Sequence, residues 1–436
     1  MEILASYNLI IEASSIIILS FIFSELARKT NVPSVLMLIA LGILLKLGLD
    51  AFGLGSIDFF PILELLGIVG LIMIVLEAAL ELELKPEKIL PIGKALAIAL
   101  ISLMISTWVA ALILHQFIKE MDMATAWLYA TPLSILSSAI IIPSVSGLGI
   151  VKKEFHIYES TFSDILGIML FYFLAGQWEA TEHSGGNGVA GFFANLGLTI
   201  AISLLASYLI LFIFQNIRSQ VKLFLLIAVL LLLYALGKKM HLSSLIIILS
   251  FGLVIANMPL FFRGRLGRWL HLEKAKNIYE GLHIITMETA FVVRTFFFVI
   301  FGLTISLVSL LHLDVALISG LVILSIYAIR FVVLRIFLGR DIIPQLFVAP
   351  RGLITILLFY AIPKEAIVPG FEAGILLFII IGTSLIMTFA MVYDKQRAGK
   401  AVKKAQSVPV GYTKWKAPTI GEAMEEERGK EAGPVQ

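Results

Sequence analysis

Residues 156–177 read HIYESTFSDILGIMLFYFLAGQ and place Glu159 and Asp164 in a run otherwise suited to hydrocarbon. The chain of 436 residues is 59% hydrophobic and 14% charged, and its mean hydropathy is +1.00. Apolar runs of roughly 18 residues or more recur over almost its whole length, which exceeds what a soluble core needs. The sequence therefore predicts an all-α polytopic membrane protein, in which a carboxylate inside a span is costly and indicates function.

Charged residues, glycines and prolines divide the chain into about thirteen predicted spans. Most lysines and arginines between the spans fall on one side, together with those of the C-terminal segment. The positive-inside rule then places the N-terminus outside and the C-terminus in the cytoplasm, and we expect a bacterial or archaeal cytoplasmic membrane. The spans are expected to begin near residues 7, 33, 59, 94, 124, 158, 189, 221, 243, 281, 314, 342 and 372.

Other classes of function find little support in the sequence. A net charge of +3 is too small to indicate nucleic-acid binding, and the absence of cysteine excludes thiolate chemistry. The seven histidines are scattered without an H-E-x-x-H pair, and no G-x-x-x-x-G-K-[ST] motif occurs. We therefore expect neither an enzyme nor an ATP-driven pump, and no cofactor.

Two predicted spans contain signs of a broken helix. Span five reads LSILSSAIIIPSVSGLG (133–149) around Pro143, and span twelve reads QLFVAPRGLITI (345–356) around Pro350 and Gly352. Proline removes a backbone donor and frees a carbonyl, and an unwound segment at membrane depth is tolerated only inside protein or beside a cavity. Interrupted helices in corresponding positions of two halves indicate the binding site of a transporter.

The two breaks also indicate how the chain is organised. They are seven spans apart and cross the membrane in opposite directions, as two inverted six-helix repeats with discontinuous crossing helices would. We expect a transmembrane domain over residues 1–393, with repeats at about 7–178 and 221–393 and a linker helix at 189–217. Residues 394–436 are expected to form a cytoplasmic tail that is largely disordered.

The spacing in the opening motif separates two roles. Ser160 and Asp164 are four residues apart and share one helical face, while Glu159 and Ser163 share another, about 140° away. We expect Asp164 and Ser160 to face an aqueous cavity beside the break in span five, where one carboxylate binds either H+ or a small cation. Glu159 is expected to face a structural partner such as an arginine.

Further charges fall inside predicted spans. Buried arginines need partners, so the intramembrane acids are candidates to pair with them. The arginines are Arg294, Arg330 and Arg351, and the acids are Glu77, Glu81, Glu159, Asp164 and Glu288.

Several motifs resemble those of the monovalent cation/proton antiporters, in particular the NhaP and sodium/proton exchanger branch, over roughly residues 1–393. The sixth helix of that branch carries Glu-Ser-x-Phe-Asn-Asp, which ESTFSD at 159–164 matches except for Ser163 at the Asn position. The segment VAPRGLI at 348–354 is similar to the GPRG segment of helix twelve, and AIRFVVL at 328–334 offers the arginine of helix eleven. The stretches IVLEAALELEL (74–84) and VIFGLTI (299–305) resemble the third and tenth helices.

The resemblance implies roles for individual residues. Asp164 would be the cation- and proton-binding carboxylate, Arg330 would hold Glu159, and Arg351 would lie near this pair. Ser137 and Ser138 occupy the ligand positions of helix five, where the exchanger branch has an acid at the position of Ser137. The stretch LSSAIII at 136–142 is closer to the Kef branch, whose ion is usually potassium. The resemblance also implies a homodimer embedded in membrane lipid.

Together these observations predict a secondary antiporter that exchanges Na+ or K+ for H+ by alternating access. If Arg330 neutralises Glu159 and Ser163 carries no charge, Asp164 alone alternates between the two ions, and the exchange is electroneutral with one ion for one. The missing acid at Ser137 keeps a second hypothesis open: a cation channel, or an uncoupled transporter-like protein, on the same scaffold.

Overall fold

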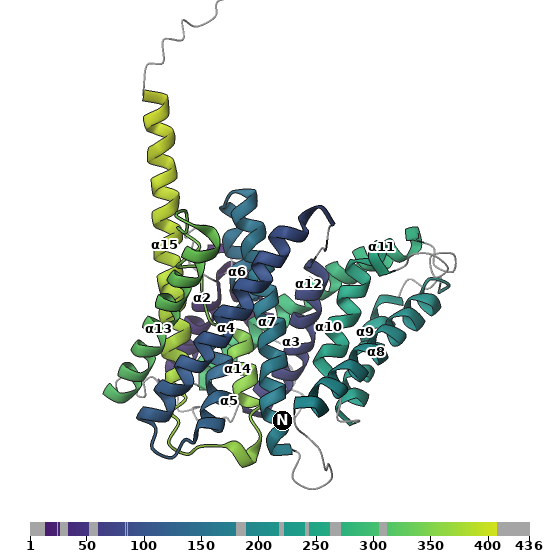
Figure 1. Cartoon of the computed structure of the whole chain (residues 1–436), viewed down its shortest axis with the longest axis horizontal. Coiled ribbons are helices and arrows are strands. Elements are labelled where there is room, and N and C mark those ends of the chain that lie inside the picture. The colour runs from purple at the N-terminus through teal and green to yellow at the C-terminus, as the bar shows by residue number, and fades with distance from the viewer. Residues whose placement is uncertain are drawn as a thin grey trace, which may run out of the picture. The chain divides into compact units, whose positions relative to one another are not determined.

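The computed structural model describes residues 14–23, 25–26, 34–51, 60–82, 84, 86–179, 189–217, 222–239, 244–261, 272–304 and 312–407. The regular structure within these residues is entirely helical, as predicted (Figure 1). Besides Ser14–Phe23, its α-helices are α2 (Ser34–Ala51), α3 (Phe60–Glu81), α4 (Ile89–Phe117), α5 (Met123–Ser134), α6 (Ser138–Ser144), α7 (Ile150–Glu179), α8 (Val189–Phe214), α9 (Lys222–Lys239), α10 (Ser244–Ala256), α11 (Met258–Phe261), α12 (Leu272–Thr304), α13 (Leu313–Leu338), α14 (Leu353–Tyr360) and α15 (Gly374–Ser407).

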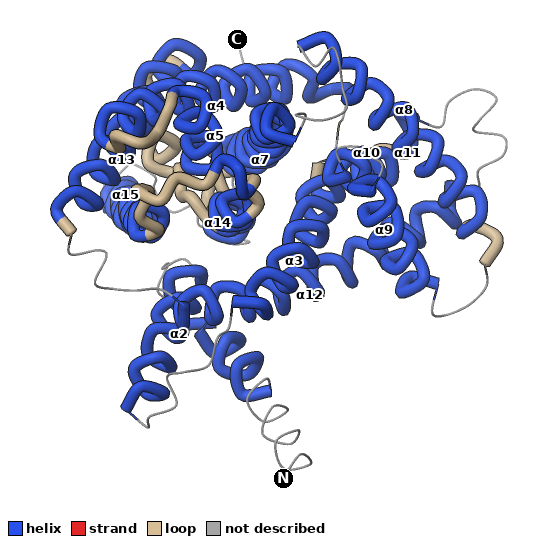
Figure 2. Tube along the Cα trace, turned by 90° about the horizontal axis from the view of Figure 1, so that it is seen from below, coloured by secondary structure: helices blue, strands red, loops and turns tan. Residues whose placement is uncertain are grey.

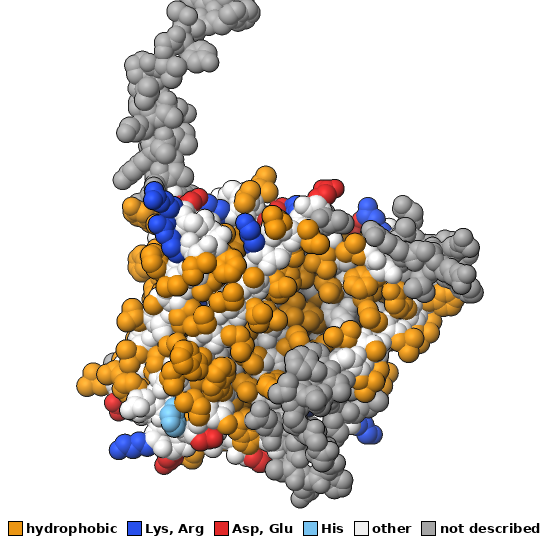
Figure 3. Space-filling model, viewed as in Figure 1, with side chains coloured by type: hydrophobic (Ala, Val, Ile, Leu, Met, Phe, Trp, Pro, Cys, Tyr) orange, Lys and Arg blue, Asp and Glu red, His pale blue; other side chains and the backbone are white. Residues whose placement is uncertain are grey.

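The helices have the length and composition of membrane spans. Among the described residues, 7 helical stretches are long and apolar enough to cross a membrane, and further apolar helices of 10–17 residues include Ser14–Phe23 and Ser244–Ala256. Hydrophobic side chains cover much of the face drawn in Figure 3, and the coloured charged groups gather along its upper and lower edges. This distribution suits a chain surrounded by lipid.

The helices of the unit Met1–Met391 pack as two bundles, seen side by side in Figure 2. In the core bundle, α4 packs on α5, α7 and α13, α7 packs on α6, and α14 packs on α5. Residues 374–391 of α15 join this bundle through hydrogen bonds from Ser319 to the Ile375 carbonyl and from Tyr327 to the Thr383 carbonyl. In the panel bundle, α12 packs on α2 and α3, and α10 packs on α3, α8 and α9. Helix α3 also contacts α6, α7 and α14, so it lies at the border between the bundles.

The short helix α5 begins at a capping residue. Asp122 is extended, with φ −71° and ψ 166°, and its side chain accepts a hydrogen bond from the Thr125 N–H at 3.2 Å. Hydrogen bonds from Thr125, first from its side chain and then from its backbone, hold the pKa of Asp122 below its usual range. The cap satisfies one of the free N–H groups at the start of the helix.

The break in span five does not lie where its proline suggested. Helix α5 ends at Ser134, residues 135–137 are extended, and α6 then runs through Pro143 to Ser144. The prediction of a break at Pro143 was therefore wrong. A proline is tolerated in this last turn of α6 because its missing N–H leaves only one carbonyl, that of Ala139, without its helical donor.

The interruption in span twelve is longer than expected. Residues 339–352 contain turns and extended backbone, with Pro350 and Gly352 in the extended part, and only α14 is helical. At the other end of the chain, α15 continues to Ser407, so the first part of the predicted tail is helical instead of disordered. The chain divides into the compact units Met1–Met391 and Val392–Gln436, and residues 408–436 lie outside the described part.

Candidate functional site

The two interrupted spans meet at their breaks. The Ser137 N–H donates to the Pro350 carbonyl at 3.0 Å, which joins one extended segment to the other. A side chain at Gly352 would not fit this approach, because its Cβ would lie 2.4 Å from the Ser137 hydroxyl oxygen. Glycine at position 352 therefore allows the two breaks to touch.

Helix α7 supplies partners for the broken backbone of span five. The Leu136 N–H donates to Ser163 Oγ at 2.9 Å, and the Ser138 N–H donates to Asp164 Oδ2 at 3.3 Å. Three successive N–H groups, at residues 136, 137 and 138, thus find three different acceptors. Buried backbone donors need such partners, so α7 and the second break together make an unwound segment stable at membrane depth.

Asp164 is buried, with 2% of its surface accessible to solvent, but it still has an oxygen atom available for a ligand. Its Oδ1 atom is buried and has no hydrogen-bond partner among the described residues, and the same holds for the Ser137 hydroxyl oxygen. Asp164 lines a small cavity whose walls come from α3, α10 and α14, including Ile74, Leu245 and Ile354. A carboxylate oxygen held in such a place is available to a proton or to a cation.

Ser160 is buried one turn before Asp164, and its hydroxyl donates to the His156 carbonyl at 2.7 Å. This bond uses the hydroxyl hydrogen and leaves the lone pairs of the oxygen free to accept a bond or to contact a cation. Ser163, which was placed on the face of Glu159, is tied to the break in span five. The structure therefore brings Asp164, Ser137, Ser138 and Ser163 together, with Ser160 on the adjacent turn.

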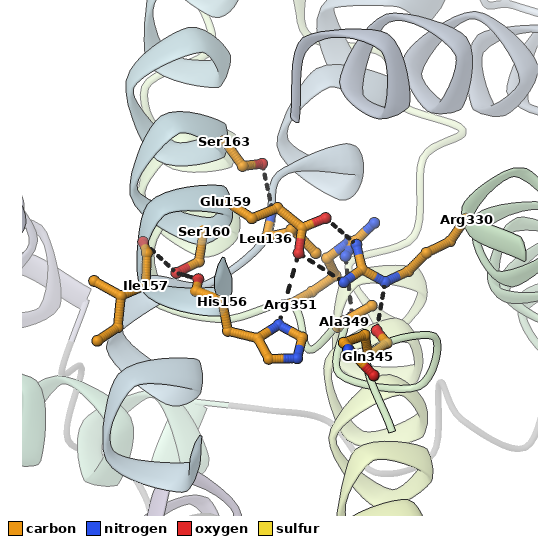
Figure 4. A network of polar contacts seen from close by, with 10 residues as sticks. All are labelled: Leu136, His156, Ile157, Glu159, Ser160, Ser163, Arg330, Gln345, Ala349 and Arg351. Atoms are coloured by element: carbon orange, nitrogen blue, oxygen red, sulfur yellow. Dashed lines mark hydrogen bonds and ion pairs between the residues drawn. The ribbon is translucent and has the colours of Figure 1, made fainter. Parts of the chain in front are cut away.

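Glu159 and Arg330 form the buried ion pair that was expected (Figure 4). The guanidinium is bidentate: Nη1 lies 2.6 Å from Oε1 and Nη2 lies 2.8 Å from Oε2. The side chains are 0% and 3% exposed, and Arg330 Nε also donates to the Gln345 carbonyl at 3.1 Å. The ring of His156 lies beside the pair, with Nδ1 3.6 Å from Glu159 Oε2. The charge of Glu159 is thus compensated within the core bundle.

Arg351 lies beside Arg330 (Figure 4) but forms no ion pair in the described part of the chain, which corrects the prediction that counted it in the structural ion pair with Glu159 and Arg330. Its Nε donates to the Leu133 carbonyl at 2.8 Å and its Nη1 to the Ala349 carbonyl at 3.0 Å. Its backbone N–H donates to Thr383 Oγ1 at 3.1 Å. The end of α5 and the extended segment before Pro350 leave carbonyls without helical donors, and the buried guanidinium satisfies them.

The remaining intramembrane charges differ in their surroundings. Arg294 of α12 pairs with Glu77 of α3, with Nη2 2.6 Å from Oε2. Glu81 is half-buried at the end of α3, and Glu288 is exposed on α12. Neither Glu81 nor Glu288 forms an ion pair with another described residue.

Almost the whole chain matches the model of one protein family. The family model described as "Sodium/hydrogen exchanger, transmembrane" matches residues 15–392. The chain belongs to the sodium/hydrogen exchanger family. This exchanger is therefore an integral membrane protein of a family of transporters for Na+ and H+, and cation/proton antiport is the activity that the family supports.

Solved structures show the same fold. A structure of the sodium proton antiporter MjNhaP1 from Methanocaldococcus jannaschii at pH 8 superposes with a TM-score of 0.66 at 20% identity, covering 92% of this chain and 98% of that one. An electron-microscopy structure of the same antiporter gives a TM-score of 0.64 at 20% identity, covering 95% of this chain and all of that one. Among curated proteins, no sequence matches this exchanger.

Proposed function

We propose that this exchanger moves one monovalent cation, Na+ or K+, against one H+ by alternating access, and that Asp164 binds either ion. The supporting observation is the unpaired Oδ1 of a buried carboxylate at the point where the two broken spans meet. Protonation neutralises this carboxylate, and so does a bound cation. Competition for a single site is sufficient to couple the two fluxes.

The oxygen atoms around Asp164 suit a hard monovalent cation. Besides the carboxylate, they include the hydroxyl of Ser137 and, on the adjacent turn, that of Ser160; the neighbouring Ser138 contributes its N–H to Asp164. Neutral oxygens combined with one carboxylate give a complex of zero net charge with Na+ or K+. The Kef-like stretch that contains Ser137 and Ser138 keeps K+ beside Na+ as a candidate.

Electroneutral exchange follows from the charges that accompany Asp164. Glu159 is neutralised by Arg330 inside the core bundle, and Ser163 and Ser137 carry no charge. The core bundle then has the same net charge when Asp164 holds H+ and when it holds a monovalent cation. No net charge crosses the membrane in one cycle.

Alternating access requires two bodies that move against each other, and we assign these to the core and panel bundles. The cavity at Asp164 has walls from both: α7 and α14 of the core, and α3 and α10 of the panel. We also propose that residues 7–178 and 221–393 are inverted repeats, that the N-terminus is outside, and that the protein is a homodimer in a bacterial or archaeal cytoplasmic membrane.

Proteoliposomes test this function against the alternative of a channel or an uncoupled protein. Purified protein is reconstituted with a pH-sensitive dye inside, an outward H+ gradient is imposed, and Li+, Na+, K+ or Rb+ is added outside. A coupled exchanger dissipates the pH gradient on addition of its cation and stops at a fixed ratio of gradients. A cation flux that follows voltage alone and leaves the pH gradient intact would show a channel instead.

A further inference from the structure

Pro143 leaves a carbonyl free at the candidate site, and an arginine of the other bundle uses it. In an α-helix the N–H of residue i donates to the carbonyl of residue i−4, so Pro143 cannot donate to Ala139. Arg294 Nη1 donates to the Ala139 carbonyl instead, at 3.3 Å. Arg294 belongs to α12 of the panel bundle and Ala139 to α6 of the core bundle, so this contact joins the two bodies.

Arg294 is held in place from its own side. Its Nη2 atom lies 2.6 Å from Oε2 of Glu77, which also belongs to the panel bundle, and the two side chains are 14% and 17% exposed. Its Nε atom is buried without a hydrogen-bond partner among the described residues. The ion pair therefore remains intact if Arg294 leaves Ala139, and the guanidinium is not locked to the core by a full set of bonds.

The docking point lies next to the carboxylate that binds the ions. Ala139 directly follows Ser138, whose N–H donates to Asp164 Oδ2. The negative charge of Asp164 on α7 favours a guanidinium docked on the neighbouring Ala139 of α6, and a cation bound at Asp164 cancels that charge. Docking of Arg294 and binding of the transported cation disfavour each other.

We propose that Arg294 is a positioning residue of the exchange cycle and that Pro143 creates its docking point. The guanidinium docks on Ala139 and ties α6 to the panel bundle, and it undocks when a cation binds at Asp164 or when the core bundle moves. This inference rests on the proposed function, because it assigns the cation to Asp164.

Pro143→Ala tests the docking point. The alanine restores an N–H that donates to the Ala139 carbonyl and competes with Arg294. A hydrogen bond to a charged group typically changes an equilibrium constant by a factor of about ten or more. Because weaker docking of Arg294 favours cation binding, we expect the KM for the transported cation to fall by about threefold to tenfold, with a smaller change in kcat. The variant should melt at or above the temperature of the wild type, because it gains a helical bond. Pro132→Ala, a proline inside α5, is the matched control and should leave KM unchanged.

A variant without the pair separates docking from other effects of the proline. In Arg294→Gln with Glu77→Gln, no guanidinium is present, and adding Pro143→Ala should not lower KM further. A KM for Pro143→Ala within about twofold of the wild type would overturn the proposal, and so would an undiminished effect in the triple variant. A Pro143→Ala protein that melts below the wild type would contradict it as well. If the wild type shows no exchange, the proposed function fails, and the docking contact is then tested by the same comparison of melting temperatures.

Discussion

Glu159→Ala removes the carboxylate from a bidentate pair whose side chains are 0% and 3% exposed. Arg330 keeps its bond from Nε to the Gln345 carbonyl, but its charge is left without a carboxylate inside the core bundle. Removing one partner of a buried pair typically costs about 3–5 kcal/mol. At roughly 1–2 °C per kcal/mol for a chain of this size, the melting temperature in detergent should fall by about 3–10 °C.

Two controls distinguish the buried charge from other effects of the substitution. Glu280 pairs with Lys276 on the surface at 3.8 Å, with side chains 56% and 70% exposed, so Glu280→Ala should change the free energy of unfolding by only about 0–1 kcal/mol. Replacing both partners, as in Glu159→Leu with Arg330→Met, removes the unpaired charge and should recover most of the loss. If Glu159→Ala has the same melting temperature as the wild type, the pair does not stabilise the core bundle and this prediction is refuted.

Three further changes test the contacts that hold the two breaks and the cap at the start of α5. Gly352→Ala forces Ser137 away and should lower both melting temperature and exchange rate, whereas Gly320→Ala, which meets nothing within 4 Å, should alter neither; equal behaviour of the two would contradict the close approach. In Arg351→Lys, the single ammonium group cannot donate to the Leu133 and Ala349 carbonyls with the geometry of the planar guanidinium. Exchange should therefore slow by at least about tenfold while the protein still folds; wild-type rates would refute this. Asp122→Ala should lower the melting temperature slightly at neutral pH. Because the folded pKa is depressed, that stabilisation is present above the ordinary value of 3.8 and is lost as pH falls, so a difference that grows toward acid would count against the cap.

Hydropathy is sufficient to predict most helices of this chain, because hydrocarbon permits only long apolar helices. Predicted starts at 189, 221, 243 and 314 lie within one residue of α8, α9, α10 and α13. The largest difference is in span twelve, where the helix begins at Leu353 and not near 342 because residues 339–352 are not helical. Two others occur where a helix continues into polar sequence. Helix α7 begins at Ile150, through the charged segment KKE, and α12 begins at Leu272, through EKAK. A prediction from hydropathy places the start of the span after such charges, although the helix already begins before them.

The candidate site was predictable where charges need partners. Glu159 and Arg330 are unmatched charges in apolar spans, and such groups find each other. The partners of Arg351 and the second contact of Arg294 are backbone carbonyls, which carry no signal in the residue types. Prolines marked the correct spans, but the position of the break in span five depends on Ser163, Asp164 and Pro350 as acceptors, which only the folded chain brings together.

The central claim is that Asp164 alone carries the exchanged ion and that Glu159 stays neutralised by Arg330. The measurement is the reversal point of transport in proteoliposomes with imposed H+ and cation gradients, with the membrane potential clamped at several values by an ionophore for an ion that is not transported. One net charge moved through 100 mV is worth about 2.3 kcal/mol, so an electrogenic cycle responds strongly to voltage. We expect a reversal point that does not move with voltage, and no exchange in Asp164→Asn. A reversal point that shifts with voltage, or exchange that persists in Asp164→Asn, would contradict it.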